Sequence, residues 1–362
     1  MRRSAGIGPH KYKLGDSFHF VDLQSGPVVA PNRIGPYSFK DALGHGGYSV
    51  VRQAIDDRTG EIYACKIIPK KRLMMQNSEE RFELEVRILE KLSHPGVVKL
   101  VDLYKDTINF YLIMELIPYG SLMQFMCTTG KIPQDKAKTI FKGIVETLDY
   151  IHNNNIAHRD IKPDNILLDP STLHIKFIDF GLSHKGQEGQ DMSKTKCGSL
   201  SYMSPECLQG NIYDGFKSDI WSLGVSLYMM LFGATPWTKN NEGALVRQIV
   251  NGEFFVSPSV GPDAQDLINR MMTVNPYERI TLREILDHPW LKGVELEKQE
   301  MVVGSKMEGK IEQFFGASDP TNPEEMREQL KDVLLKAKAR RRMVIQPKVR
   351  SSSITNMPMM RI

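Results

Sequence analysis

The 362-residue chain is poor in cysteine and in long apolar runs. Its four cysteines, Cys65, Cys127, Cys197 and Cys207, lack the spacing of a disulfide framework or a metal site. The N-terminus has no sustained apolar stretch of the secretory type. The most apolar segment, residues 222–234, is shorter than the roughly 20 residues that cross a bilayer, so it predicts a buried helix. These absences favour an intracellular protein without a transmembrane segment, in the cytoplasm or alternatively in the nucleus.

Most of the chain also lacks a net charge. The segment from Lys292 to the end carries 14 Lys/Arg and 10 Asp/Glu, and this excess of four equals the formal charge of the whole chain, +4. Residues 1–291 are therefore neutral overall. This balance gives no sign of a nucleic-acid-binding core, and it confines the basic character to the C-terminal tail.

The order of sequence patterns predicts an α+β fold with a small β-rich part followed by a larger helical part. Residues 1–36 hold several Gly, Pro and polar residues without periodicity, which is typical of an extension. From about 37 to 119, short β-rich runs surround one strong helical pattern at 78–92. Helical patterns dominate from about 120 to 291. Residues 292–362 are expected to form a C-terminal extension.

A glycine-rich segment, Gly44–Val51, lies between two apolar runs near the start of the β-rich part. Gly44 and Gly46 allow a tight turn whose backbone amides can approach phosphate oxygens. A purely structural hairpin turn explains this segment equally well.

Lys66 sits inside the apolar run Ile62–Ile68, which suits a strand buried on both faces. A buried ammonium needs a partner. On the following helix, Glu85 lies three residues after Phe82 and four before Leu89, so it projects from the apolar face and is the expected counter-ion. Taken alone, the pair is better explained as a structural ion pair, or Lys66 as a side chain that reaches solvent.

The segment His158–Asn165 gathers three different chemical groups within six residues. Asp160 offers a carboxylate, Lys162 an ammonium and Asn165 an oxygen ligand, between a helical pattern and a β-like run. Asp179 ends a second apolar run fourteen residues after Asn165, and a glycine two residues later lets the chain turn away. Asp179 and Asn165 are candidates to share a magnesium ion, because Mg²⁺ prefers oxygen ligands.

These elements, in this order, resemble the signature motifs of the eukaryotic protein kinases. The resemblance covers about residues 37–291 and implies a two-lobed kinase fold, with an N-lobe at about 37–119 and a C-lobe at about 120–291. It implies ATP as the phosphate donor, Mg²⁺ as the cofactor and other proteins as substrates. The remaining matched motifs are Ser204-Pro205-Glu206, Asp219 in Ser-Asp-Ile-Trp-Ser-Leu-Gly, Arg279 and His288-Pro289-Trp290. Glu206 and Arg279 are expected to form a structural ion pair.

The resemblance implies a role for each matched catalytic position. Lys66 would hold the α- and β-phosphates of ATP and be fixed by Glu85. Asp160 would orient the substrate hydroxyl and accept its proton, and Lys162 would lie near the transferred phosphate. Positioning and charge neutralisation matter more here than a strong base, because the phosphoryl group is loosely bonded in the transition state.

The resemblance also implies the binding sites for nucleotide and metal. The residues expected to bind ATP are Leu43, Gly44, Gly46, Val51, Ala64, Lys66, Met114, Glu115, Ile117 and Leu167. Met114 would be the gatekeeper at the back of the adenine site, and Glu115 would begin the hinge between the lobes. Asn165 and Asp179 would bind magnesium.

Several residues refine the class of kinase. Lys162, two residues after Asp160, is typical of serine/threonine kinases, and the wider pattern resembles the calcium/calmodulin-dependent and AMP-activated kinase group. Ser49 replaces the third glycine of the loop. Ser121 stands where many relatives have a glutamate that contacts a basic substrate residue, and only Asp164 remains of that acidic pair. We therefore expect no strong preference for arginine three residues before the target.

Arg159, directly before the catalytic aspartate, marks kinases that the resemblance links to phosphorylation of the following loop. Residues 183–196 are polar and aperiodic, which predicts such a loop. By its spacing before Gly198, Thr195 is the expected acceptor for an upstream activating kinase, and Ser193 is second. A merely solvated loop is the alternative.

The tail contains a predicted basic amphipathic helix at about 323–343. Asn322 begins it well, and apolar residues follow at helical spacing from Met326 to Ala337. From Lys336 onward there are eight positive side chains and no acidic one. The functional interpretations are an autoinhibitory or calmodulin-binding segment, a membrane-surface contact and a nuclear address. A helix that docks on the kinase or stays in solvent has equal weight.

The sequence therefore predicts a protein serine/threonine kinase. The alternative is a nucleotide-binding pseudokinase or scaffold, and the complete set of catalytic and metal positions argues against it. A small-molecule or nucleotide kinase would need a Gly-x-x-x-x-Gly-Lys-Ser/Thr loop, which the sequence lacks.

Overall fold

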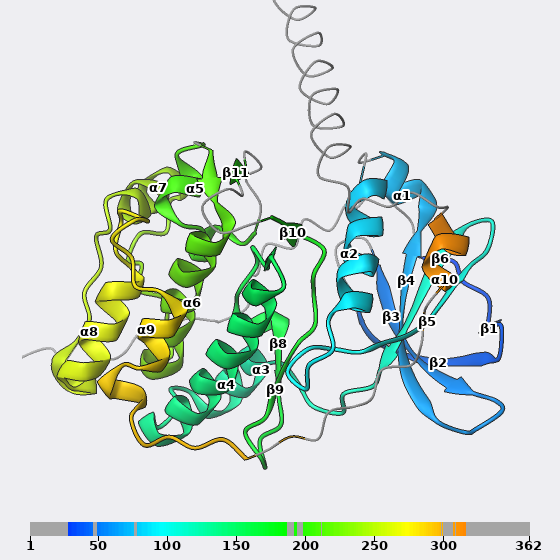
Figure 1. Cartoon of the computed structure of the whole chain (residues 1–362), viewed down its shortest axis with the longest axis horizontal. Helices are drawn as coiled ribbons and strands as arrows, with labels where there is room; N and C mark the ends of the chain where they lie inside the picture. The colour runs from blue at the N-terminus through cyan, green and yellow to red at the C-terminus, as the bar shows by residue number, and fades with distance from the viewer. Residues whose placement is uncertain are drawn as a thin grey trace, which may run out of the picture. The chain divides into compact units, whose positions relative to one another are not determined.

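The computed structural model describes residues 28–45, 49–75, 78–186, 192–193, 198–210, 212–297, 299, 307 and 309–315 (Figure 1). The strands are β1 (Arg33–Ile34), β2 (Tyr37–His45), β3 (Val50–Asp56), β4 (Ile62–Pro69), β5 (Leu100–Lys105), β6 (Asn109–Glu115), β7 (Ile156–Ala157), β8 (Ile166–Leu168), β9 (Ile175–Phe177), β10 (His184–Lys185), β11 (Met192–Ser193) and β12 (Tyr213–Asp214). The α-helices are α1 (Lys70–Met75), α2 (Glu79–Lys91), α3 (Leu122–Thr129), α4 (Gln134–Asn153), α5 (Pro205–Leu208), α6 (Gly215–Phe232), α7 (Glu242–Val250), α8 (Pro262–Met271), α9 (Leu282–Leu286) and α10 (Lys310–Phe315). The chain divides into two units, Met1–Phe314 and Phe315–Ile362, and the features below lie in the first.

The first part of the chain is built on one antiparallel sheet. Among the described residues its strand order is β1-β2-β3-β4-β6-β5. Its strands are rich in β-branched and aromatic residues, and their inward side chains meet in a core that includes Phe39, Ala54, Cys65, Ile67 and Tyr111. The predicted strong helix of the β-rich part is confirmed, since α2 occupies all but its ends, and the structure adds the short helix α1, which was not predicted.

The sheet starts before the predicted boundary at residue 37. Strand β1 pairs with β2, with Arg33 opposite Ser38 and Ile34 opposite Tyr37. The strand therefore lies inside the segment expected to be an N-terminal extension, residues 1–36. A two-residue strand leaves no periodic pattern, so only its pairing partner identifies it.

The second part is mainly helical and is organised around α6. This helix is buried on almost all sides and contains the fully buried Trp221, which confirms the predicted buried helix. Gly233 ends it with a φ of 74°, a left-handed conformation that glycine adopts without strain. Close to α6, Arg279 donates to both carboxylate oxygens of Glu206 at 2.8 and 3.0 Å, so the predicted ion pair is also confirmed.

Two short segments depart from the predictions. Within the predicted loop 183–196, β10 pairs with β7 and β11 pairs with β12. In the predicted C-terminal extension, α10 begins at Lys310 and lies beside β5 and β6 (orange in Figure 1). Within the ranges described above, none of the helices combines the length and the apolar character needed to cross a membrane.

Candidate active site

The register of the sheet aligns the glycine-rich strand with Lys66. Gly44 of β2 lies opposite Val51 of β3, and Val51 lies opposite Lys66 of β4. Directly paired residues on antiparallel strands project to the same face, so these three positions share one face of the sheet. Ala64 projects from the same face two residues before Lys66, and it lies opposite Met114 of β6. The strand pairing thus assembles five of the predicted ATP-binding positions.

Lys66 makes the predicted pair with Glu85. Its ammonium lies 2.6 Å from Glu85 Oε1 and 3.5 Å from Asp179 Oδ1. Glu85 is buried on the inner face of α2, as its spacing from Phe82 indicated. Burial acts to lower the pKa of Lys66, but the two carboxylates outweigh it and the pKa lies above its usual value. Lys66 is therefore a fixed positive charge at neutral pH.

The segment 158–165 is held by Asp219 of α6. The two carboxylate oxygens of Asp219 accept the backbone N–H of His158 at 2.8 Å and of Arg159 at 2.7 Å. Arg159 has a φ of 65°, which is uncommon for a residue with a side chain. Asp219 also lies 2.9 Å from His152 Nε2 of α4. A buried carboxylate on one helix thus sets the path of the segment.

Asp160 is the centre of a small hydrogen-bonded group. Lys162 Nζ donates to Asp160 Oδ2 at 2.8 Å and to Ser199 Oγ at 3.0 Å. Asn165 Nδ2 donates to the carbonyl and to Oδ2 of Asp160, at 2.9 and 2.8 Å. The 3₁₀ turn Pro163–Asn165 brings the amide back toward the aspartate. Asp160 is therefore in direct contact with Lys162 and with Asn165.

Gly198 brings the chain after the predicted loop close to Asp160. Its φ is 97°, and a Cβ at this position would lie 3.2 Å from the carbonyl oxygen of Arg159 and 3.3 Å from Asp160 Oδ1. A side chain here would crowd the aspartate in a backbone conformation that already disfavours it.

Asp179 and Asn165 supply oxygen ligands suited to magnesium. Partial burial acts to raise the pKa of Asp179, but Lys66 and the N–H of Gly181 outweigh this effect and hold the pKa below its usual value. Its side chain is 47% exposed, which leaves oxygen surface for a ligand. The side-chain nitrogen of Asn165 donates to Asp160, so its side-chain oxygen, Oδ1, is the atom that can bind a metal. In the described ranges, no three His, Cys, Asp or Glu side chains form a metal cluster. Mg²⁺ commonly takes one or two protein oxygens, with phosphate and water as further ligands.

The other predicted ATP positions that the structure describes are Leu43, Glu115, Ile117 and Leu167. Leu43 of β2 is 50% exposed. Leu167 lies on β8, opposite Lys176 of β9 and bridged to Ser121. The carboxylate of Glu115 is used elsewhere, since it lies 2.8 Å from Lys176 Nζ and accepts the backbone N–H of Lys99.

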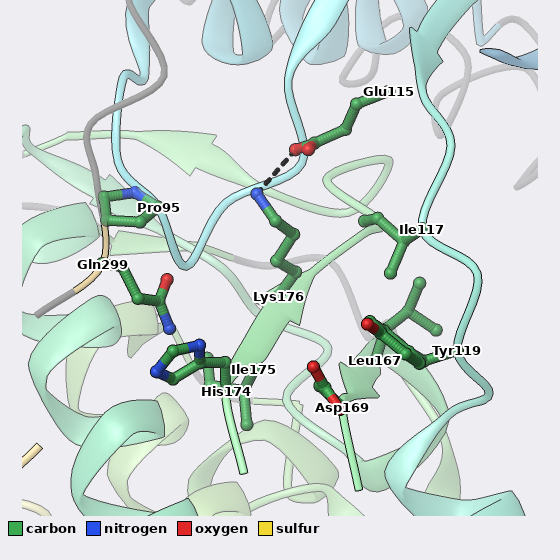
Figure 2. Close-up of a pocket in the computed structure, with 10 residues that line it drawn as sticks. All are labelled: Pro95, Glu115, Ile117, Tyr119, Leu167, Asp169, His174, Ile175, Lys176 and Gln299. Atoms are coloured by element: carbon green, nitrogen blue, oxygen red, sulfur yellow. Dashed lines mark hydrogen bonds and ion pairs between the residues drawn. The ribbon is translucent and has the colours of Figure 1, made fainter. Parts of the chain in front are cut away.

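A cavity of about 370 Å³ is lined in part by Glu115, Ile117 and Tyr119 (Figure 2). Figure 2 shows Lys176 reaching toward Glu115, with Ile117, Tyr119 and Leu167 on the side away from Pro95. The lining residues are Pro95, Glu115, Ile117, Tyr119, Leu167, Asp169, His174, Ile175, Lys176 and Gln299. The cavity shares three residues with the predicted nucleotide site and contains none of the predicted catalytic residues.

Three predictions fall outside the described residues: Gly46 of the glycine-rich loop, Thr195 as the phosphorylation site, and the basic helix at 323–343. Other contacts were missed by the sequence interpretation. Ser199 as a partner of Lys162 and Lys176 as a partner of Glu115 are long-range contacts without a local signal. By contrast, the spacing of Met307, Ile311 and Phe314 is helical and offered a weak signal for α10.

Comparison with known proteins identifies the family. The protein kinase domain model matches residues 37–291. Similar proteins are a carbon catabolite-derepressing protein kinase of Candida tropicalis, 39% identical over 74% of this chain, and the serine/threonine-protein kinase cds1 of Schizosaccharomyces pombe, 33% identical over 83%. A probable serine/threonine-protein kinase, fhkE, of Dictyostelium discoideum is 39% identical over 70%. These alignments span 43%, 67% and 37% of the relatives' own lengths.

The chain therefore belongs to the protein kinase family. The sheet with α2 is the N-lobe of the kinase fold, and the helical part is its C-lobe. The resemblance to the calcium/calmodulin-dependent and AMP-activated kinase group is confirmed by these relatives. Membership of the family implies ATP as a substrate and, typically, Mg²⁺.

Proposed function

We propose that this chain transfers the γ-phosphate of ATP to serine or threonine hydroxyls of other proteins. One observation carries the proposal: the Lys66 ammonium lies between Glu85 and Asp179, while Asp160 is held by Lys162 and Asn165. This arrangement provides a cation for phosphate, a carboxylate for the hydroxyl and oxygen ligands for a metal. The alternative function is that of a pseudokinase, which lacks one of these three groups. Such a protein would have no need to keep the other groups in contact.

ATP would bind across the inner face of the N-lobe sheet. We assign adenine to the space between Val51 and Ala64 above and Leu167 below, with Leu43 at the rim and Met114 as the gatekeeper. The carboxylate of Glu115 pairs with Lys176, so we assign any contact of Glu115 with adenine to its backbone. Ile117 would continue the hinge, and Gly44 and Gly46 would cover the phosphates.

Lys66 would then hold the α- and β-phosphates, and Glu85 would keep its ammonium in place. Asp160 would orient the substrate hydroxyl toward the γ-phosphorus. As the new oxygen–phosphorus bond forms and the bond to the β-phosphate oxygen breaks, the hydroxyl proton passes to Asp160. Lys162 would neutralise charge on the transferred group. Asn165 and Asp179 would hold Mg²⁺, which would supply positive charge to neutralise the phosphates.

We propose serine and threonine as the phosphorylated residues because of Lys162 and because the relatives are named serine/threonine-protein kinases. We assign the kinase domain to residues 37–291, with lobes at about 37–119 and 120–291. Because Ser121 caps α3 by accepting the backbone N–H of Gln124, its hydroxyl is engaged within the protein. This supports the expectation of no strong preference for a basic residue three positions before the target.

Regulation by an upstream kinase at Thr195, sensed by Arg159, is part of the proposal. The C-terminal basic helix at about 323–343 is proposed as an autoinhibitory or calmodulin-like contact. An intracellular, cytoplasmic setting fits these roles, with the nucleus as the alternative.

The deciding experiment is phosphate transfer from labelled ATP to a generic protein substrate, after treatment with an activating kinase that phosphorylates Thr195. We expect phosphoserine and phosphothreonine, and a loss of at least about a hundredfold in kcat for Asp160→Asn, since its carboxylate is the proton acceptor. Asp135→Asn removes the same charge at an exposed position of α4 and should leave the rate unchanged. If Thr195-phosphorylated protein binds ATP and Mg²⁺ yet transfers nothing, the scaffold function replaces the enzymatic one.

A further inference from the structure

Helix α10 packs on the edge of the N-lobe sheet, about 200 residues away from it in the sequence. Met307, Ile311 and Phe314 are all buried. Lys310 Nζ forms an ion pair with Asp102 Oδ1 of β5 at 2.5 Å, and Lys105 Nζ donates to the carbonyl oxygen of Phe314. Apolar burial and two polar contacts therefore attach this six-residue helix to β5.

A line of aromatic rings connects α10 to α2, the helix that carries Glu85. The ring of Phe314 lies 5.5 Å from the ring of Phe110 on β6. Phe110 in turn stacks on Phe82 of α2, with ring centroids 4.7 Å apart. Contacting aromatic pairs stabilise each other beyond their buried area. Phe314 therefore reaches α2 through a single intervening ring.

Phe82 and Glu85 are three residues apart on α2, so they lie on the same face of the helix and move together. Phe82 contacts the β6 ring, and Glu85 pairs with Lys66 at 2.6 Å. A contact that keeps Phe82 against Phe110 therefore also favours the position of α2 in which the ion pair is made.

We propose that Phe314 is a positioning residue of the phosphate-transfer site: by packing on Phe110 it holds Phe82, and with it α2, where Glu85 fixes Lys66. The inference rests on the proposed function, because it concerns the residues assigned to ATP phosphates. It gives the segment after the kinase domain a supporting role, in contrast to the inhibitory role proposed for the basic helix further on.

The first test uses point variants of the full chain. Phe314→Ala should weaken Mg²⁺·ATP binding by roughly three- to tenfold, the effect expected from losing an aromatic contact that biases α2. Phe314→Leu keeps most of the apolar volume and should restore most of the affinity. Gln313→Ala alters the exposed neighbouring residue of the same helix and should leave affinity and kcat unchanged. Nucleotide affinity is measured by equilibrium titration well below the melting temperature of each variant.

The second test uses reciprocity. If docked α10 strengthens ATP binding by some factor, ATP must strengthen α10 docking by the same factor. Saturating Mg²⁺·ATP should therefore slow hydrogen exchange of the α10 amides in the unaltered chain. In Glu85→Gln, where the ion pair with Lys66 is lost, the same addition should leave α10 exchange nearly unchanged.

The outcomes separate this inference from the proposed function. One outcome would overturn the inference: Phe314→Ala lowers the melting temperature but leaves ATP affinity unchanged, and ATP does not change the hydrogen exchange of α10. That result would show that the helix only covers the sheet edge. Absence of phosphate transfer by the unaltered chain would instead overturn the proposed function. Nucleotide affinity and exchange can still be measured in that case, because neither requires transfer.

Discussion

Asp219 Oδ1 accepts the backbone N–H of Arg159 at 2.7 Å, and Arg159 has a φ of 65°. A left-handed conformation costs roughly 1–2 kcal/mol in a residue with a side chain. The charged acceptor on α6 offsets that strain, and it also binds the N–H of His158. The geometry of the segment that carries Asp160 thus depends on a residue about 60 positions later in the chain.

Replacement of Asp219 should therefore reduce both stability and activity. Asp219→Ala leaves two inward N–H groups without their acceptor, so we expect the free energy of unfolding to fall by about 2–4 kcal/mol. Asp219→Asn keeps one acceptor oxygen and should show a smaller loss. Urea unfolding and kcat measured on both variants check this. Equal stability of Asp219→Ala and the unaltered chain would contradict it.

His158 should make stability depend on pH in a defined window. Burial lowers the pKa of His158 below its usual 6.5, and the opposing effect of Asp219 is smaller. Below about pH 6.5 the unfolded chain binds a proton that folded His158 does not, so the free energy of unfolding falls as the pH falls. His158 contributes at most about 1.4 kcal/mol per pH unit to the slope of the free energy of unfolding against pH.

The test compares the unaltered chain with His158→Phe, which keeps an aromatic ring between Phe177 and Phe180 and cannot titrate. Unfolding free energies are measured from pH 7.5 down to pH 5. The difference between the two proteins should change with pH only below about 6.5. A constant difference across the range would rule out His158 as the titrating group.

Removal of the metal should abolish phosphate transfer. We expect excess chelator to stop the reaction and Mg²⁺ to restore it, since Asn165 and Asp179 are assigned to the metal. Asp179→Asn should raise the Mg²⁺ concentration needed for half-maximal activity by about tenfold or more. The control is Asp287→Asn on the far part of the C-lobe, after α9, which should not alter the requirement. Full activity of the unaltered chain in chelator would contradict the assignment.

The buried pair Arg279 and Glu206 should be needed for stability and not for chemistry. The Arg279 side chain is fully buried, so Arg279→Met leaves an unpaired carboxylate, and we expect a loss of about 3–5 kcal/mol. The double variant Arg279→Met with Glu206→Leu removes both charges and should lose less than Arg279→Met alone. Chemical unfolding of both variants tests this. A double variant that is less stable than Arg279→Met would overturn the argument.

The sequence predicted those helices and strands whose pattern of apolar and charged residues lies within one short segment of the chain. The apolar run around Lys66 and the spacing of Glu85 predicted a strand, a helix and their ion pair, and the structure confirms all three. Strand β1 and helix α10 were missed because each is too short to form without its partner. The contact between Lys310 and Asp102 joins residues 208 positions apart, and no local pattern encodes such a pairing.

The docked position of α10 also has a practical consequence for producing the protein. The family match ends at residue 291, so a recombinant fragment cut there would lack α10 and uncover the apolar surface around Phe110. The edge strand β5 would lose its cover as well, and uncovered edges and apolar patches promote aggregation. Poor solubility of that fragment would reflect the missing helix, and soluble preparations should extend through residue 315.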